Sequence, residues 1–495
     1  MIKIRNSNIR IASYGLLLVS VICFFLTWLR WYVGFSATIL VLFGYYRLIK
    51  DLAQDESEIL IDRKTLMLIG ALMIAWTLFC GLGGATPQKN DLHWRNAILH
   101  DLINYPWPVH YTDGLDSTLN YYFAFWIIPA LLGKAALHLF GANAAWLVAN
   151  ISYSFYCVIF LCAVVLLLVS YLKSTSIKRV LFVVGILIFF SGLDIIPLIL
   201  AQADQENISI GKHLEWWTWL QYSSNTTQLG WVFNQAIPAW LVTALLFHEK
   251  RMNHYAYLGL LLLPFGPIPF VGVFFIMVIQ ALMSFTAALR GKELRGLIGE
   301  IFTVPNIVAM LGILPIYWLF YFTNTAASTG GFGTNIFSPV VYLPFVIFEF
   351  ALYAILILPG SARERFFMSA VLGLFIVPLF TLGEGPDFCM RASIPMLFAL
   401  MVYVTRYLLN NIEFVDCERL IIDKTSALLL LLLIIGAVTP LTEFRETYRQ
   451  IDYSINNHTS FYADKFGTLD DGDMPRDNFI TINSTDTMFY QYLAK

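Results

Sequence analysis

A polar stretch at residues 84–141 carries most of the side chains of this chain that are suited to acid–base or anion chemistry. Carboxylates act as general bases, and guanidinium or ammonium groups neutralise phosphates. Long apolar runs flank the stretch. We therefore expect the reactive groups to lie here. Its ionisable residues include Asp91, Asp101, Asp113, Asp116, His93, His100, His110, Arg95 and Lys134.

Asp91 stands directly before the segment LHWRNAILHDLIN. Trp94, Ile98 and Leu102 recur there at helical spacing, which predicts an amphipathic helix on the outer membrane surface. Asp91 then has two interpretations. Its carboxylate either accepts the first free amides of that helix as an N-cap or acts as a general base at the lipid–water boundary. The pattern favours the cap, and both roles are compatible only if the helix amides leave part of the carboxylate free.

The stretch 201–229 is a second polar segment, rich in aromatic residues. Indole rings stack on the apolar faces of sugars, and nearby carboxylates and amides bind sugar hydroxyls, so the composition suits a carbohydrate site. An aromatic belt at the membrane interface explains the tryptophans equally well. Six consecutive polar residues, 223–228, are not explained by such a belt. The candidate binding residues are Asp204, Glu206, His213, Glu215, Trp216 and Gln221.

Four further charged residues have both a functional and a structural interpretation. Asp387 and Arg391 are four residues apart at the mouth of an apolar run, as in a helix-surface ion pair. Alternatively, Arg391 binds a lipid-linked phosphate through its forked guanidinium. Lys134 either extends to lipid headgroups, which we favour, or binds phosphate. Asp194 interrupts an apolar run and is expected to face a polar cavity or a polar partner.

The composition is that of a membrane protein. Hydrophobic residues make up 58% of the 495 residues and charged residues only 13%, with a mean hydropathy of +0.68. Soluble domains carry about twice that charged fraction. Apolar runs of roughly 17–25 residues recur, each long enough to cross a bilayer as a helix. The fold class expected is therefore all-α, a polytopic helical membrane protein.

Several function classes lack their sequence signatures here. No basic cluster interleaved with aromatic residues occurs, so nucleic acid is not an expected partner. The sequence contains no GxxxxGK[ST] loop, no HExxH pair and no GxSxG elbow, which are typical of nucleotide-driven motors, zinc proteases and serine hydrolases.

The positions of Lys and Arg predict the topology, because these residues collect on the cytoplasmic side. Lys3, Arg5 and Arg10 place the N-terminus in the cytoplasm. Alternation then gives about thirteen crossings, with interfacial helices in the first long outer loop and the C-terminus outside. Segment 119–141 is expected to dip into the outer leaflet as a broken helix, and 255–288 to form a hairpin that turns at 266–269.

This topology divides the chain into a transmembrane domain at 1–442 and a small extracytoplasmic tail at 443–495. The stretch 84–141 becomes the first outer loop, and 201–229 becomes the second outer loop. The topology implies that the chain crosses a membrane many times, and the family resemblance given next implies a bacterial inner (plasma) membrane.

The outer loops resemble those of the GT-C class of polytopic glycosyltransferases and those of uncharacterised bacterial membrane proteins of this sort. Asp91 matches an acidic residue early in the first long outer loop. A segment from Tyr121-Tyr122 through Lys134 to Leu139-Phe140-Gly141 follows and leads into a long helix. Asp204 and Glu206 match a second acidic cluster in the next outer loop. The likeness covers roughly the first half of the chain, and two extra crossings precede the acidic loop here.

The resemblance implies a glycosyltransferase that takes a sugar from a polyprenyl-phosphate carrier to an acceptor on the outer face of the membrane. Asp91 would be the catalytic base, and Arg391 with Lys134 or Arg95 would neutralise the phosphate. No cofactor is certain, and a divalent cation is an open option because no metal-coordinating pair is identified. The partners expected are the lipid-linked donor and membrane lipid. The remaining candidate substrate-binding residues are His100, Asp101, Asp204, Glu206, His213, Glu215, Trp216, Gln221 and Asp387.

Two alternatives remain open at the level of sequence. A transporter or flippase for a lipid-linked glycan would place charges within the spans, and here those are sparse. A polysaccharide polymerase shares the substrate, the side of the membrane and the aromatic loops.

Overall fold

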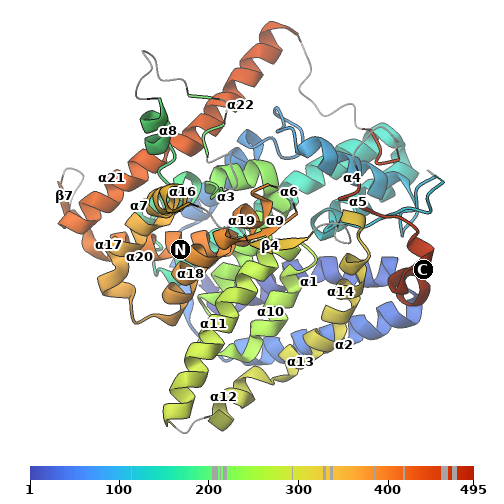
Figure 1. Ribbon diagram of the computed structural model, residues 1–495, viewed down its shortest axis with the longest axis horizontal. Coiled ribbons are helices and arrows are strands. Elements are labelled where there is room, and N and C mark those ends of the chain that lie inside the picture. Colours follow the sequence, from blue (N-terminus) through green and yellow to red (C-terminus); the bar gives the residue numbers. More distant parts are fainter. Residues whose placement is uncertain are drawn as a thin grey trace.

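The computed structural model describes residues 1–112, 114–202, 210–211, 213–215, 220–291, 294–326, 331–334, 338–383, 385–415, 419–458, 467–470 and 476–495. Helices form the scaffold, as expected (Figure 1). In the described part, eight helical segments are long and apolar enough to cross a membrane. These eight segments are fewer than the predicted crossings, so the count of about thirteen stays a prediction. The eight are Asn6–Trp28, Trp31–Leu52, Ala142–Tyr171, Asn225–Leu246, Pro267–Gly291, Val304–Phe322, Pro339–Ser361 and Lys424–Asn456.

The helices fall in chain order as follows. In the first half they are α1 Asn6–Trp28, α2 Trp31–Leu52, α3 Arg63–Phe79, α4 Leu92–Asn104, α5 Ala124–Phe140, α6 Ala142–Tyr171, α7 Ile177–Phe189, α8 Ile195–Ala201 and α9 Asn225–Leu246. In the second half they are α10 Tyr255–Leu262, α11 Pro267–Gly291, α12 Leu294–Ile301, α13 Val304–Gly312, α14 Leu314–Phe322, α16 Pro339–Val346, α17 Leu352–Ser361, α18 Arg365–Ile376, α19 Asp387–Ala392, α20 Ile394–Asn411, α21 Lys424–Gly436 and α22 Val438–Asn456.

Four short antiparallel strand pairs connect segments at the ends of the helices. They are β1 Ile2–Arg5 with β2 Glu58–Ile61, β3 Thr118–Leu119 with β8 Ile480–Thr481, β4 Phe332–Thr334 with β5 Phe380–Leu382, and β6 Ile412–Val415 with β7 Arg419–Ile422. Short 3-10 or π-helical turns complete the set at Met252–His254, Ile347–Ala351, Val377–Leu379, Ser484–Asp486 and Phe489–Leu493.

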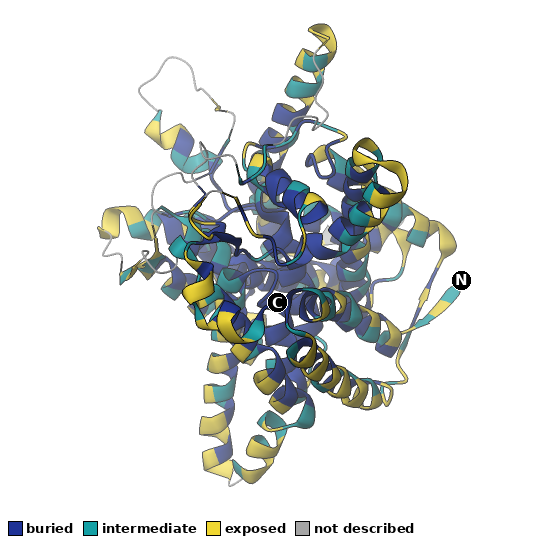
Figure 2. Ribbon diagram, turned by 90° about the vertical axis from the view of Figure 1, so that its right-hand side faces the viewer, coloured by how far each residue is buried: buried dark blue, intermediate teal, exposed yellow. Residues whose placement is uncertain are grey.

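Helix α9 is the centre of the bundle. Its most apolar 18-residue window is 94% buried, more than that of any other candidate span in the described part. Ser224 caps its first turn by accepting a hydrogen bond from the Thr227 amide at 3.0 Å. Buried residues gather in the middle of the molecule, and the outer helices turn exposed residues outward (Figure 2). Large apolar side chains such as Leu311 and Trp318 are among the exposed ones, which suits contact with lipid.

Segments predicted to be cytoplasmic lie together at one end of the bundle. Strand β1, at the N-terminus, pairs with β2 in the segment 49–64. Arg10 binds Glu249 at 2.7 Å, which joins the same end to the turn after α9. The positive-inside pattern therefore predicted correctly which of these segments share an end.

Segments predicted to lie outside meet at the opposite end. Strand β3 of the first polar loop pairs with β8 of the tail, and β4 pairs with β5. The turn between α1 and α2 joins this end too, because Arg30 Nε donates to the Ala494 carbonyl at 2.9 Å. The predicted tail boundary at 442 falls within α22, which continues to Asn456 and projects beyond its neighbours (Figure 1).

Four local predictions need comparison with the structure. The hairpin at 255–288 is confirmed, since α10 ends at Leu262 and α11 begins at Pro267. The predicted break in 119–141 is wrong: α5 runs unbroken from Ala124 to Phe140. Pro129 lies inside α5. Its missing N–H removes one backbone hydrogen bond, but the helix continues past it. Gly133 brings α5 close to Ala149 of α6.

Helix α4 does not lie on the surface as an amphipathic helix. Nine of its residues are buried, Arg95 and Asp101 among them, because α5 covers one side and the tail covers another. Residues 225–229 are also not part of a polar loop, since they form the first turn of α9 and are buried.

Candidate functional site

The first group of candidate residues lies at the start of α4. Asp91 occupies the N-cap position, but its side chain makes no capping hydrogen bond and is 44% exposed. Arg95 is buried, and its Nη1 lies 3.4 Å from the Asp91 carboxylate and 2.7 Å from the Asp91 carbonyl oxygen. The predicted capping bond is therefore wrong, and the half-exposed carboxylate lies beside the Arg95 guanidinium instead.

A matching pair lies on α19, far away in sequence. Arg391 Nη2 is 2.9 Å from Asp387, whose side chain is 48% exposed. Arg391 Nη1 donates to the Tyr122 hydroxyl at 2.9 Å, and that hydroxyl also accepts from Gln235 of α9 at 3.3 Å. The ion pair that the four-residue spacing predicts is therefore present, and it is tied to the first polar loop.

Tyr121 and Tyr122 bring the two arginines to one place. The rings of these tyrosines are 3.7 Å apart between centroids. The Tyr121 hydroxyl lies within electrostatic range of both Arg95 and Arg391, and Arg391 lies within range of Asp91. Two guanidinium groups and two half-exposed carboxylates thus converge at the end of the bundle where the first polar loop and the tail meet. We call Asp91, Arg95, Asp387, Arg391 and Tyr122 the arginine site.

Aromatic rings border the arginine site. Phe479 of the tail stacks on Trp94 of α4 at 5.5 Å between centroids and contacts Tyr121 at 4.9 Å. The tail therefore contributes directly to the surroundings of the arginines.

The arginine site has unused hydrogen-bonding capacity. Among the described residues, the buried Nε atoms of Arg95 and Arg391 have no acceptor. The Oε1 atom of Gln235, whose Nε2 donates to the Tyr122 hydroxyl, is likewise buried without a partner. Buried polar groups normally find partners, so unfilled donors beside two cations favour an anionic ligand.

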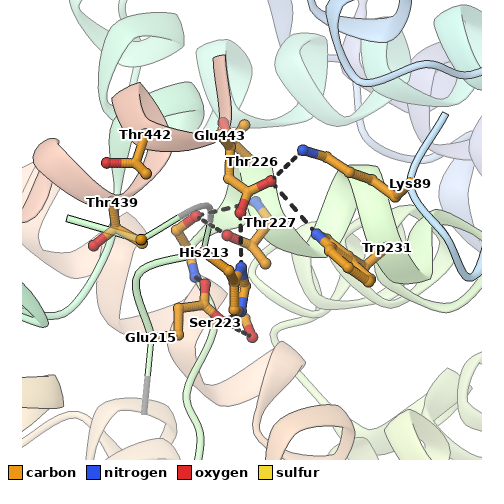
Figure 3. Close-up of polar contacts among 12 residues, drawn as sticks. Lys89, His213, Glu215, Ser223, Thr226, Thr227, Trp231, Thr439, Thr442 and Glu443 are labelled. Carbon is orange, nitrogen blue, oxygen red and sulfur yellow. Dashed lines mark hydrogen bonds and ion pairs between the residues drawn. The ribbon is translucent and has the colours of Figure 1, made fainter. Parts of the chain in front are cut away.

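A second polar group lies one turn away along α9 (Figure 3). His213 Nδ1 is 2.8 Å from Glu443 of α22, and His213 Nε2 is 3.5 Å from Glu215. Lys89 binds the other oxygen of Glu443 at 2.6 Å, and Trp231 donates to it at 3.5 Å. The two polar loops and α22 therefore meet at one end of the bundle.

Glu215 is held by the polar run at the start of α9. Its carboxylate accepts from Gln221 and Ser223, both at 2.7 Å, and from the Ser224 amide at 3.1 Å. These hydrogen bonds give Glu215 and Gln221 partners within the protein. The polar run 223–228 is therefore explained by its bonds to Glu215 and by its role in capping and packing α9.

His213 is cationic at neutral pH. Burial of the imidazole lowers its pKa, but the neighbouring carboxylates of Glu215 and Glu443 outweigh burial and raise the pKa to about 9. The Lys89 and His213 cations together face the Glu443 carboxylate, so this group is an internal charge cluster.

Three other predicted residues have structural partners instead. Lys134 donates to the carbonyls of Ile103 and Tyr105 at the end of α4, so it reaches neither headgroup nor phosphate in this conformation. Asp101 is fully buried and accepts from Tyr111 and from the Leu469 amide, while His100 contacts Asp101 at 3.1 Å. Asp204, Glu206 and Trp216 lie outside the described residues.

No set of three or more His, Cys, Asp or Glu residues in the described part is arranged to hold a metal ion. The divalent cation left open by the sequence therefore has no matching ligand set among these residues.

Several contributors were missed by sequence reasoning. Lys89, Tyr122, Gln235, Glu443 and Phe479 come from five separate elements. Their types are ordinary for a membrane protein, and only the polar pair Asn234-Gln235 inside an apolar run was a usable signal. Comparison of the chain with family models, with curated proteins and with solved structures gave no match.

Proposed function

We propose that this protein is a membrane glycosyltransferase that transfers a sugar from a polyprenyl-phosphate carrier to an acceptor. The observation that carries the proposal is the arginine site, where two guanidinium groups, each with a buried and unfilled Nε donor, meet beside a half-exposed carboxylate. A lipid-linked phosphate suits both the cations and the surrounding apolar helices.

In the proposed reaction, Arg95 and Arg391 hold the carrier phosphate, which is the leaving group. Asp91 takes the proton from the acceptor hydroxyl as that oxygen attacks the anomeric carbon. The new glycosidic bond forms, the bond to the phosphate oxygen breaks, and the phosphate leaves with its negative charge neutralised by the arginines. Trp94, Tyr121 and Phe479 supply the aromatic surface beside the sugar.

The setting we propose is a bacterial inner membrane, with the N-terminus in the cytoplasm and the arginine site and the C-terminus outside. The distribution of Lys and Arg supports this orientation. A total of about thirteen crossings belongs to the same proposal.

Binding of polyprenyl phosphate to the purified protein tests the arginine site. We expect the wild-type protein in detergent to bind the lipid in native mass spectrometry, and Arg391→Gln to weaken binding about 10- to 100-fold, as expected for a lost charge-assisted hydrogen bond. Arg47→Gln, at an exposed position on α2, is the matched control. Equal binding by wild type and Arg391→Gln would overturn the phosphate assignment.

Turnover tests Asp91 separately. Asp91→Asn should retain lipid binding and lose about 10²- to 10⁴-fold of sugar transfer in membranes supplied with polyprenyl-phosphate sugars, since only the base is removed. Undiminished transfer by Asp91→Asn would show that Asp91 is not the base.

One observation supports a second candidate, a carrier for a lipid-linked glycan. Two buried carboxyl groups, Asp194 and Glu349, meet beside a broken helix, which is an arrangement typical of transporters. Movement of a labelled lipid-linked glycan across proteoliposomes, without sugar transfer, would favour this candidate over the enzyme.

A further inference from the structure

The apolar run at 177–201 is interrupted in its middle. Helix α7 ends at Phe189, α8 begins at Ile195, and Asp194 lies at the end of the break. One oxygen of Asp194, Oδ2, accepts from Ser191 at 3.2 Å and from Thr439 of α22 at 2.7 Å. The sequence predicted a continuous span here, with a polar partner for Asp194. The partner is confirmed, and the continuous span is wrong.

A second distortion faces this break. Residues Ile347–Ala351 form a π-helical turn inside the candidate span 339–361, and Glu349 lies in it. The Leu193 amide donates to the Phe348 carbonyl at 2.9 Å, which ties the break to the turn. A Cβ on Gly192 would lie 2.0 Å from Glu349 Oε2, so glycine is needed for this approach. Such π-helical turns occur frequently at functional sites.

The carboxyl groups of Asp194 and Glu349 lie within direct interaction range of each other, across the close contact between Gly192 and Glu349. Both residues are almost fully buried, with exposures of 3% and 1%. Among the described residues, no donor reaches Oδ1 of Asp194 or either oxygen of Glu349. Two neighbouring carboxylates that are buried without donors cannot both carry charge. Protonation of one carboxyl group removes that charge and provides the donor that the unpartnered oxygens lack.

The neighbouring groups do not supply that donor. Tyr353 of α17 donates to the Ser191 carbonyl, and Tyr222 donates to the Leu374 carbonyl. Glu215 adds a third carboxyl nearby, and Cys389 contributes a buried thiol. His213 is the cation within range of Asp194, but its nitrogens face Glu215 and Glu443.

We propose that Asp194 and Glu349 form a proton-binding site at the α7–α8 break, which holds one proton shared between the two carboxyl groups. A proton fits better than a metal ion, because both carboxyl groups are almost fully buried and no metal-ligand set occurs among the described residues. The site does not rest on the glycosyltransferase proposal, since different residues form it.

Dicyclohexylcarbodiimide tests the site directly, because it modifies protonated carboxyl groups in apolar surroundings. We expect peptide mass spectrometry of the full-length protein in detergent at pH 7 to find the modification on Glu349 or Asp194. Glu300 and Glu364, which pair with Arg251 and Arg406, are internal controls and should stay unmodified. An unmodified pair, or equal modification of the controls, would overturn the proposal.

A Glu349→Gln variant and a sodium control test the proton assignment further. In Glu349→Gln the new amide can donate to Asp194, so Asp194 should ionise and its modification should be lost. Infrared spectra in D₂O should show a protonated carboxyl band in the wild type that is missing in this variant. Protection of the pair by sodium at constant pH, without any effect of pH itself, would make it a sodium site and contradict the proton assignment. Should Glu349→Gln fail to fold, the wild-type modification and its internal controls still decide.

Discussion

At the scale of single residues, neighbouring carboxylates on α4 do different work because their surroundings differ. Asp91 is half-exposed and free of capping bonds, whereas Asp101 is buried and bonded to Tyr111 and to the Leu469 amide. Burial and hydrogen bonding therefore distinguish Asp91, the candidate base, from Asp101, a structural group. Neither property can be read from the sequence.

Asp101→Asn is expected to destabilise the protein by about 1–3 kcal/mol, because it disturbs a buried acceptor that holds the tail. Thermal unfolding in detergent measures the effect. Asp91→Asn is the control and should unfold at the wild-type temperature. An equal loss of stability in both variants would contradict the division of roles.

The titration of His213 should lower the folding stability of the protein at alkaline pH. Its folded pKa of about 9 lies above the usual value of about 6.5. A raised folded pKa means that the stabilisation is fully present below pH about 6.5 and is lost as pH rises through about 9. The wild-type melting temperature should therefore fall between pH 7 and pH 9.5.

His213→Gln should lack this alkaline fall in melting temperature, since glutamine does not titrate. His138→Gln, at an exposed position on α5, should keep it. The same pH profile in wild type and His213→Gln would rule out His213 as its source.

At the scale of elements, the break between α7 and α8 depends on close approach of the π-helical turn. Gly192→Ala places a methyl group against Glu349 and should destabilise the protein by about 1–3 kcal/mol, as overpacking does. Gly185→Ala on α7 is the matched control, because nothing lies within 4 Å of its Cβ position. Chemical or thermal unfolding of both variants checks the contrast.

The helices also show which parts of the fold could be predicted from the sequence. The lengths of the apolar runs predicted long membrane-crossing helices such as α1, α2, α6 and α11, because a bilayer requires long helices with internally satisfied backbones. The break at Asp194 and the burial of α4 were not predictable, since both depend on elements distant in the chain, namely α22, the π-helical turn and the tail.

At the scale of the whole molecule, the tail closes over the first polar loop. Thr118 and Thr481 are directly opposite each other in the β3–β8 pair. Cysteines at both positions should form a disulfide on mild oxidation, because opposite residues in antiparallel strands lie within bonding reach. Mass spectrometry of the linked peptides detects it, and the two single-cysteine variants serve as controls. Absence of the link would show that the tail does not dock in this way.

Sidedness gives another prediction for the whole molecule. Cysteines introduced at the exposed positions Asn90 and Gly211 should react with an impermeant thiol reagent from outside intact cells, and a cysteine at exposed Glu56 should react only after lysis. Labelling of Asn90→Cys and Gly211→Cys from opposite sides would remove the shared site and the enzyme proposal with it.

The sequence by itself determined the membrane-spanning helical class, the segments that share an end of the bundle and the ion pair of Asp387 with Arg391. These features follow from local composition: apolar length for helices, the positions of Lys and Arg for the segments that share an end, and four-residue spacing for the ion pair. Only the tertiary structure decided that Arg95 and Arg391 meet at Tyr121, that Lys134 and Asp101 are structural, and that Asp194 pairs with Glu349. Those outcomes depend on contacts between residues up to hundreds of positions apart, which packing alone creates.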